Sequence, residues 1–285
     1  MASGRDSLHP AAVMSTSARL TLCGSLSLHP VGTGAAMHLA AYRALDLPFT
    51  YVPFKVTDLA GAITGMRALG IRGFGISMPY KQDVIPLLDA LDPLAARIGA
   101  VNTVVNDDGR LVGHNTDAAG AARAVEEVRP LAGARVLLLG AGGAARAVAH
   151  AAVDRGARVT IANRSVIKAE ELAEAAGARA AGLDEIDRAA DYDVLINATS
   201  VGMREVDARS PIPEAVLRTG QVVMDIVYKP IETELVRAAR ARGAIAIHGG
   251  RMLLHQAARQ LELYTQHEAP LAAMEAALFD QIGRA

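Results

Sequence analysis

The chain has 285 residues, 51% of them hydrophobic, which is enough to bury a sizeable core in one or two domains. Lys and Arg total 29 and Asp and Glu total 30, so the formal net charge of -1 argues against a basic surface for nucleic acid or an anionic membrane. The single cysteine, Cys23, excludes an intrachain disulfide framework and favours a reducing, cytoplasmic setting, and no His or Cys spacing indicates a metal site.

The first half of the chain alternates strand-like and helix-like segments after a leader at 1–17, which we expect to be disordered. Two of the expected strands flank Asp107-Asp108-Gly109, a strong tight-turn signal that predicts a hairpin. In chain order we expect a strand at 19–23, a helix at 35–45, a strand at 49–54, a helix at 59–69, a strand at 73–77, a helix at 81–91, strands at 101–106 and 110–114, and a helix at 117–128.

A second alternating series follows and predicts an α/β fold of two domains, with a cleft between them that suits a small ligand. The apolar run at 136–153 is broken by glycines, so a strand, a turn and a helix fit it better than a membrane span. The expected order is a strand at 135–139, a helix at 142–155, a strand at 158–162, a helix at 166–176, strands at 193–198 and 221–227, a helix at 231–242, a strand at 244–248, and helices at 251–264 and 270–282.

The turn between the strand at 135–139 and its helix is rich in glycine. Gly140 permits the sharp turn, and Gly142 lets the backbone approach a pyrophosphate. Gly143 and Ala144 open the helix, whose N-terminus offers unpaired N–H groups and a partial positive charge to an anion. The alternative is a turn that serves only close helix–strand packing, but its position between a clear strand and a clear helix favours a dinucleotide site.

The end of the next strand distinguishes between nicotinamide cofactors. An NAD site usually has an acidic residue here for the ribose hydroxyls, whereas this chain has Asn163, Arg164 and Lys168. The two cations suit a 2′-phosphate, although a solvated basic helix start would have the same residues. The sequence therefore predicts NADP.

Several motifs combine polar residues with tight turns or apolar surroundings. A lysine taken alone is usually a solvated charge, but Lys81 follows an apolar strand and a proline, at a corner where functional side chains collect. The motifs are Pro79-Tyr80-Lys81, Gly99 to Thr103, Gly113 to Asp117, Asn163-Arg164-Ser165, Asn197 to Met203, Asp225 to Pro230, and Met252 to Gln256. In this order and at this spacing they make the chain, from about residue 18 onwards, similar to the shikimate dehydrogenase family.

The resemblance implies a discontinuous substrate-binding and catalytic domain at 18–117 plus 253–285, and a Rossmann-like NADP-binding domain at 118–252. It also implies NADP-dependent interconversion of 3-dehydroshikimate and shikimate in aromatic amino acid biosynthesis. Lys81 and Asp117 would be the catalytic pair, because hydride transfer to or from a secondary alcohol needs a group that exchanges the hydroxyl proton. Further expected ligands are Asn102 and Gln256 on ring hydroxyls, Tyr228 beside the substrate, and Thr199 and Gly249 on the cofactor.

Two positions depart from the family pattern. The family has Ser-x-Ser-Pro for the substrate carboxylate where this chain has Gly32-Thr33-Gly34-Ala35, and Ser25 and Ser27 reach that place only with a two-residue slip. The family's Asn-Val-Thr becomes Gly75-Ile76-Ser77, so only the hydroxyl at Ser77 is kept. We expect Gly32, Gly34 and Ser77 to lie at the substrate, the small residues to enlarge the pocket, and shikimate to be used weakly.

Three interpretations remain open. The chain is an NADP-dependent enzyme that prefers a related cyclic hydroxy acid, an ordinary shikimate enzyme with sequence drift, or a catalytically weak NADP-binding sensor of the same fold. The intact motif residues favour an enzyme. We expect a small-molecule substrate, no nucleic-acid or membrane partner, and a monomer or homodimer.

Overall fold

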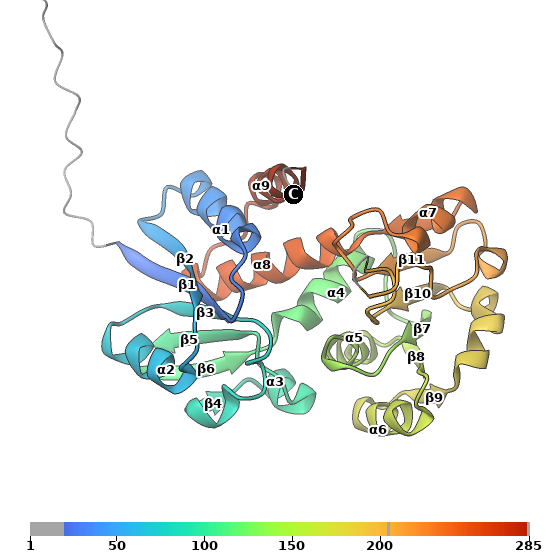
Figure 1. The fold of residues 1–285 in the computed structure, drawn as a ribbon, viewed down its shortest axis with the longest axis horizontal. Helices are drawn as coiled ribbons and strands as arrows, with labels where there is room; N and C mark the ends of the chain where they lie inside the picture. The colour runs from blue at the N-terminus through green and yellow to red at the C-terminus, as the bar shows by residue number, and fades with distance from the viewer. Residues whose placement is uncertain (1–19, 204–205, 284–285) are drawn as a thin grey trace, which may run out of the picture.

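The computed structural model describes residues 20–203 and 206–283, so the expected leader at 1–17 and the first residue of the expected strand at 19–23 lie outside the described residues. Two sheets stand side by side, each with its own helices (Figure 1). This arrangement confirms the predicted α/β fold class. Among the described residues, no helix is both long and apolar enough to cross a membrane.

The first sheet has the strand order β2-β1-β3-β5-β6-β4. β1 pairs in parallel with β2 and β3, and β5 and β6 form the predicted antiparallel hairpin. Since β2 and β3 lie on opposite sides of β1, the order reverses there and leaves a crevice at the carboxyl ends of β1 and β3. The strands are β1 (Thr21–Ser27), β2 (Phe49–Lys55), β3 (Gly73–Ile76), β4 (Ala90–Leu91), β5 (Thr103–Asp107) and β6 (Arg110–His114).

The helices that accompany this sheet are α1 (Gly32–Ala44), α2 (Leu59–Ala68) and the short α3 (Pro93–Ile98). The sequence predicted α1 and α2 but not α3, and one helix that it predicted is absent. The predicted helix at 81–91 is wrong: turns, a single 3₁₀ turn at Ile85–Leu87 and strand β4 occupy that segment. Pro86 lies inside it, and a proline removes a helix N–H donor and clashes with the preceding turn.

The second sheet is parallel throughout, in the order β12-β11-β10-β7-β8-β9. Its order reverses between β7 and β10, which places a second crevice at their carboxyl ends. The strands are β7 (Arg135–Leu139), β8 (Arg158–Ala162), β9 (Arg179–Ala181), β10 (Val194–Asn197), β11 (Val222–Asp225) and β12 (Ile245–Ile247). The helices are α5 (Gly143–Asp154), α6 (Val166–Ala176) and α7 (Glu234–Ala241), with 3₁₀ segments at Leu183–Asp191 and Glu214–Val216.

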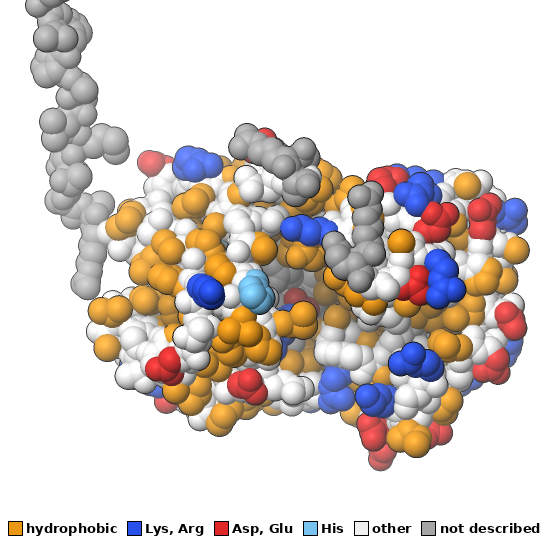
Figure 2. All heavy atoms as spheres, in the orientation of Figure 1, with side chains coloured by type: hydrophobic (Ala, Val, Ile, Leu, Met, Phe, Trp, Pro, Cys, Tyr) orange, Lys and Arg blue, Asp and Glu red, His pale blue; other side chains and the backbone are white. Residues whose placement is uncertain are grey.

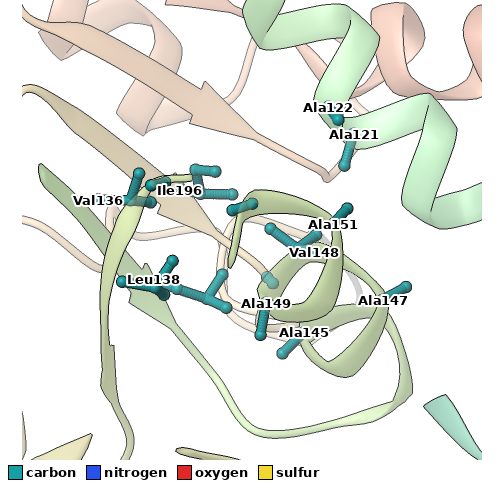
Figure 3. Close-up of a cluster of buried hydrophobic side chains, with 14 of the residues drawn as sticks. Ala121, Ala122, Val136, Leu138, Ala145, Ala147, Val148, Ala149, Ala151 and Ile196 are labelled. Carbon is teal, nitrogen blue, oxygen red and sulfur yellow. The ribbon is translucent and has the colours of Figure 1, made fainter. Parts of the chain in front are cut away.

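Helices α4 (Thr116–Glu126) and α8 (Gly249–Thr265) run between the two sheets, and α9 (Leu271–Gly283) packs against α1 (Figure 1). A two-pronged ion pair from Arg123 to Glu262, with N–O distances of 2.7 and 3.0 Å, ties α4 to α8. The alanine face of α5 lies between strands β7 and β10 and helix α4 (Figure 3). Because alanine ends at Cβ, the α5 backbone can approach both neighbours closely, which fixes the helix that follows the glycine turn.

Candidate active site

A cavity of about 300 Å³ lies between the two sheets, where the surface is hollowed in Figure 2. Its first wall comes from the crevice between β1 and β3, with Ser25, Ser27, Gly75 and Ser77. The facing wall comes from α5 and the segment after β11. The lining residues that the sequence predicted are Gly34, Ser77, Lys81, Asn102, Asp117, Ala144, Tyr228, Gly249 and Gln256.

Lys81 and Asp117, predicted as a catalytic pair, are in contact in this cavity. The Lys81 Nζ lies 2.5 Å from Asp117 Oδ2, and the exposed fraction is 31% for the Lys81 side chain and 14% for that of Asp117. Asn102 donates from Nδ2 to the other oxygen of Asp117, at 2.9 Å, and to Gln256 Oε1, at 3.3 Å. A cation, a carboxylate and two amides thus converge on one partly buried point, which is able to exchange a proton with a bound hydroxyl.

Local sequence explains how this cluster is held. Asn115 caps α4, since its Oδ1 accepts from the Ala118 N–H at 3.4 Å, so Asp117 falls in the first helical turn. On the other side, the Tyr80 hydroxyl donates to the Val56 carbonyl at 2.6 Å and anchors the turn that carries Lys81. The catalytic candidates therefore come from a helix start and an anchored turn, both rigid supports.

The end of the cavity around β1 differs from expectation. Gly34 lines the cavity, and a Cβ added there would meet nothing within 4 Å, whereas a Cβ at Gly32 would face Gln281 of α9 and Gly32 is not a lining residue. The expected extra room at Gly75 is absent, because a Cβ there would lie 3.0 Å from the Tyr51 hydroxyl and 3.3 Å from Gln260 Nε2. The pocket is therefore open beside Gly34 but filled beside Gly75.

Sequence reasoning missed part of this wall. Ser25 and Ser27, set aside for their spacing, both line the cavity, and their alternation along β1 was a usable signal because residues i and i+2 face the same side of a strand. Gln260 lies one turn after Gln256 on α8, so the i, i+4 spacing could have indicated it. Thr33, which stands between the two glycines of the expected carboxylate site, lines the cavity as well. His29 and Tyr51 also line it, and no sequence pattern marked them.

The glycine turn has the geometry of an anion cradle. Gly140 has a φ of 110°, and a Cβ there would lie 2.9 Å from the Ala198 carbonyl oxygen, so the position requires glycine. In front of it, a Cβ at Gly142 or Gly143 would meet nothing within 4 Å, which leaves open space at the N-terminus of α5. A pyrophosphate group fits this space and the exposed N–H groups beside it.

Arg164 and Lys168 are exposed and flank a cavity of about 240 Å³, which Gly142, Asn163 and Ser165 also line. Asn163 shapes the rim, since its Nδ2 donates to the Ser165 carbonyl at 3.0 Å. Among the residues that the structure describes, neither cation makes an ion pair, so both charges remain available to a ligand. A phosphate on the ribose of a bound dinucleotide suits them.

The predicted Thr199 lies at the second crevice, at the mouth of a neighbouring cavity of about 490 Å³. Asn197 Oδ1 accepts from the Thr199 N–H at 3.0 Å and hydroxyl at 2.7 Å, and its Nδ2 donates to Asp225 at 2.9 Å. Burial raises the pKa of Asp225, while hydrogen bonds from Thr233, the Val227 N–H and Asn197 act in the opposite direction. This network joins the loops after β10 and β11, both of which border the candidate cofactor site.

Comparisons with known proteins agree with this geometry. Residues 31–104 match the model of the shikimate dehydrogenase substrate binding domain, residues 122–237 that of shikimate / quinate 5-dehydrogenase, and residues 249–279 that of the shikimate 5′-dehydrogenase C-terminal domain. A shikimate dehydrogenase (NADP(+)) of Halorubrum lacusprofundi is 47% identical over 265 residues, which cover 88% of this chain and 95% of the relative.

Solved structures are also similar. A shikimate dehydrogenase in complex with NADP+ has a TM-score of 0.86 at 36% identity, with 92% of this chain and 96% of that chain covered. The 5-ketofructose reductase of Gluconobacter sp. strain CHM43 has a TM-score of 0.85 at 33% identity, with 92% and 99% covered. Proteins of this architecture are thus named for more than one substrate.

Proposed function

The chain belongs to the shikimate dehydrogenase family and is an NADP-dependent oxidoreductase acting on a CH–OH group, and we propose that it prefers a cyclic hydroxy acid related to shikimate over shikimate itself. One observation carries the proposal: an intact proton-exchange cluster around Lys81 faces a cavity end in which Gly34 leaves open space. In this proposal residues 18–117 with 253–285 bind the substrate, and residues 118–252 bind NADP.

Bound NADP supplies or accepts the hydride at its nicotinamide ring. The protein residues then exchange the proton: Lys81 Nζ gives a proton to the oxygen of a carbonyl substrate or takes one from a hydroxyl. Asp117 holds the Lys81 side chain at 2.5 Å, and Asn102 fixes the Asp117 carboxylate. Gln256 has a side-chain nitrogen with no hydrogen-bond partner among the described residues, so it can donate to a second substrate hydroxyl.

On the cofactor side, the support comes from the open N-terminus of α5 and the two unpaired cations beside it. Gly142, Gly143 and Ala144 would receive the pyrophosphate, and Arg164 with Lys168 would hold the 2′-phosphate. Gly249 and Tyr228 line the substrate cavity together with Lys81 and would hold the nicotinamide ring beside the substrate. Thr199 lines the neighbouring cavity together with Asn163 and Arg164 and would contact the cofactor there.

Replacing Arg164 by alanine is expected to lower the preference for NADPH over NADH by about 10–10²-fold, since a charge-assisted hydrogen bond contributes about 1.5–3 kcal/mol. Dissociation constants for both cofactors, measured by fluorescence titration, check this. Arg158→Ala, on an exposed arginine at the opposite end of β8, is the matched control and should leave the preference unchanged. An Arg164→Ala protein that keeps the full preference would assign the 2′-phosphate to other residues.

The proposed function itself is tested by NADPH oxidation and NADP+ reduction across a panel of cyclic hydroxy acids and their ketones. Shikimate, quinate and ring-substituted relatives form the panel, and 5-ketofructose is added because a structural relative is named for it. We expect kcat/KM to be highest for a ring acid other than shikimate. Highest activity on the neutral ketosugar would reject the acid class, and tight NADPH binding without turnover of any compound would identify a sensor.

A further inference from the structure

A chain of buried polar side chains runs from the back of the substrate cavity to the candidate catalytic cluster. His38 on α1 is 0% exposed, Gln260 on α8 is 5% exposed and Thr103 on β5 is 0% exposed. They come from three elements distant in sequence, and Gln260 also lines the cavity. Because a buried polar group is costly unless it is hydrogen-bonded, such a chain requires an explanation.

The orientation of the Gln260 amide is fixed at both ends. Its Nε2 lies 3.2 Å from the carbonyl oxygen of Asn102, which only accepts, so the nitrogen must be the donor there. Its Oε1 lies 3.3 Å from His38 Nε2 and therefore accepts from that ring nitrogen. Burial lowers the pKa of His38 to about 4, so near neutral pH the ring carries a single proton, on Nε2.

The ring of His38 is itself held in place. It stacks on Tyr51, with ring centroids 4.3 Å apart and planes 4° from parallel. Its Nδ1 has no hydrogen-bond partner in the described part of the chain, in agreement with a proton on Nε2. The imidazole thus acts as a fixed single donor toward Gln260.

The hydrogen bonds that begin at Gln260 continue, each with a defined donor, to the catalytic candidates. Gln260 Nε2 donates to Thr103 Oγ1 at 3.0 Å, which turns the Thr103 proton toward Asn102 Oδ1 at 2.8 Å. Asn102 Oδ1 also accepts from the Thr116 N–H at 2.7 Å. With its oxygen engaged on that side, Asn102 directs its Nδ2 toward Asp117.

We propose that Gln260, held by His38, is a positioning residue for the reaction and acts through Thr103 and Asn102 on the Asp117–Lys81 pair. The inference rests on the proposed role of that pair. Packing alone does not require this chain, since a methionine of similar length would fill the same space. What the amide adds is a defined direction for the Thr103 hydroxyl, whose proton then reaches Asn102 Oδ1 beside the Thr116 N–H.

The test is Gln260→Met, which keeps the side-chain length and removes both hydrogen-bonding ends. We expect kcat on the best substrate to fall on the order of 10-fold or more, up to about 10²-fold, because small displacements of reacting groups have effects of this size. KM and NADPH affinity should change little. A raised KM with unchanged kcat would instead make Gln260 a substrate ligand and overturn the proposal.

A double-mutant cycle separates positioning from a general structural role. In a Thr103→Val background the link through the Thr103 hydroxyl to the Asn102 side chain is already broken, so Gln260→Met should have almost no further effect on kcat. Additive losses would contradict the proposal. Gln221→Met is the matched control: Gln221 is also fully buried and donates to two backbone carbonyls, of Ala189 and Tyr192, but lies away from the cavity. It should lower thermal stability and leave kcat unchanged.

A readout without turnover keeps this inference separate from the proposed function. Exchange of the Asn102 side-chain amide protons with water, followed by ¹⁵N NMR, should quicken in Gln260→Met and stay unchanged in Gln221→Met. Unchanged exchange in Gln260→Met would overturn the positioning role even if the enzyme is active. Two results together would separate the two proposals: a Lys81→Ala enzyme that retains activity, and faster exchange of the Asn102 amide protons in Gln260→Met. The assignment of the catalytic pair would then fail, while the hydrogen-bond chain from Gln260 to Asn102 would stand.

Discussion

Replacing Lys81 by alanine is expected to lower kcat on the best substrate by about 10²–10⁴-fold, the range typical for removal of a general acid or base. The Lys81 ammonium group lies next to Asp117 in the cavity. Alanine leaves no group there to exchange a proton with the substrate hydroxyl. NADPH affinity should persist, because the residues proposed to bind the pyrophosphate and the 2′-phosphate lie at the glycine turn before α5 and after β8, on the second sheet. Steady-state kinetics with a fluorescence titration of NADPH measures both.

Lys81→Arg distinguishes proton transfer from simple charge placement. A guanidinium keeps the positive charge beside Asp117 but does not give up a proton in proteins, so this variant should be nearly as inactive as the alanine variant. Lys55→Ala, on an exposed lysine at the end of β2, is the control and should retain full activity. High activity in Lys81→Arg would mean that the cation only orients the substrate and that another group carries the proton.

Local chemistry made much of the fold and of the catalytic cluster predictable. The strand, glycine turn and helix around Gly140 follow from backbone requirements that few other residues satisfy, as the positive φ at that position shows. Lys81 and Asp117 were identified from motifs at compatible spacing, and they prove to be in contact although they are 36 positions apart. Their roles in catalysis remain predictions.

The remaining features depend on tertiary packing, which single-sequence patterns do not contain. The helix expected at 81–91 is absent because Pro86 interrupts that segment, which forms a 3₁₀ turn and strand β4 instead. The wall beside Gly75 could not be predicted, since the Tyr51 hydroxyl that fills it comes from a different strand. The i, i+4 spacing from Gln256 indicates Gln260 as a cavity residue, but its hydrogen bond to His38, 222 positions away, is visible only in the folded structure.

Shikimate is expected to be used with a kcat/KM about 10²–10⁴-fold below that of an enzyme in which two serine hydroxyls hold the shikimate carboxylate. Each lost hydroxyl contact to a carboxylate costs about 1.5–3 kcal/mol, and each 1.36 kcal/mol is tenfold in rate. The family's two serines are glycines at 32 and 34 in this chain. Ser25 and Ser27 also line the cavity, so efficient shikimate oxidation by the unmutated protein would mean that they supply the carboxylate contacts instead. Ser25→Ala would then lower that activity by about 10–10²-fold.

Restoring one serine tests the cause of the deficit. Gly34→Ser should raise kcat/KM for shikimate by about 10–10²-fold, the value of one hydrogen bond to a charged group. The substitution fits, because Gly34 lies in helix α1 without a positive φ and its Cβ would enter open space within the cavity. Gly32→Ser is the matched control, since a side chain there faces Gln281 of α9 instead of the cavity, and it should leave shikimate use unchanged. Equal gains from both serines, or a gain only at Gly32, would show that the substrate carboxylate lies elsewhere than beside Gly34.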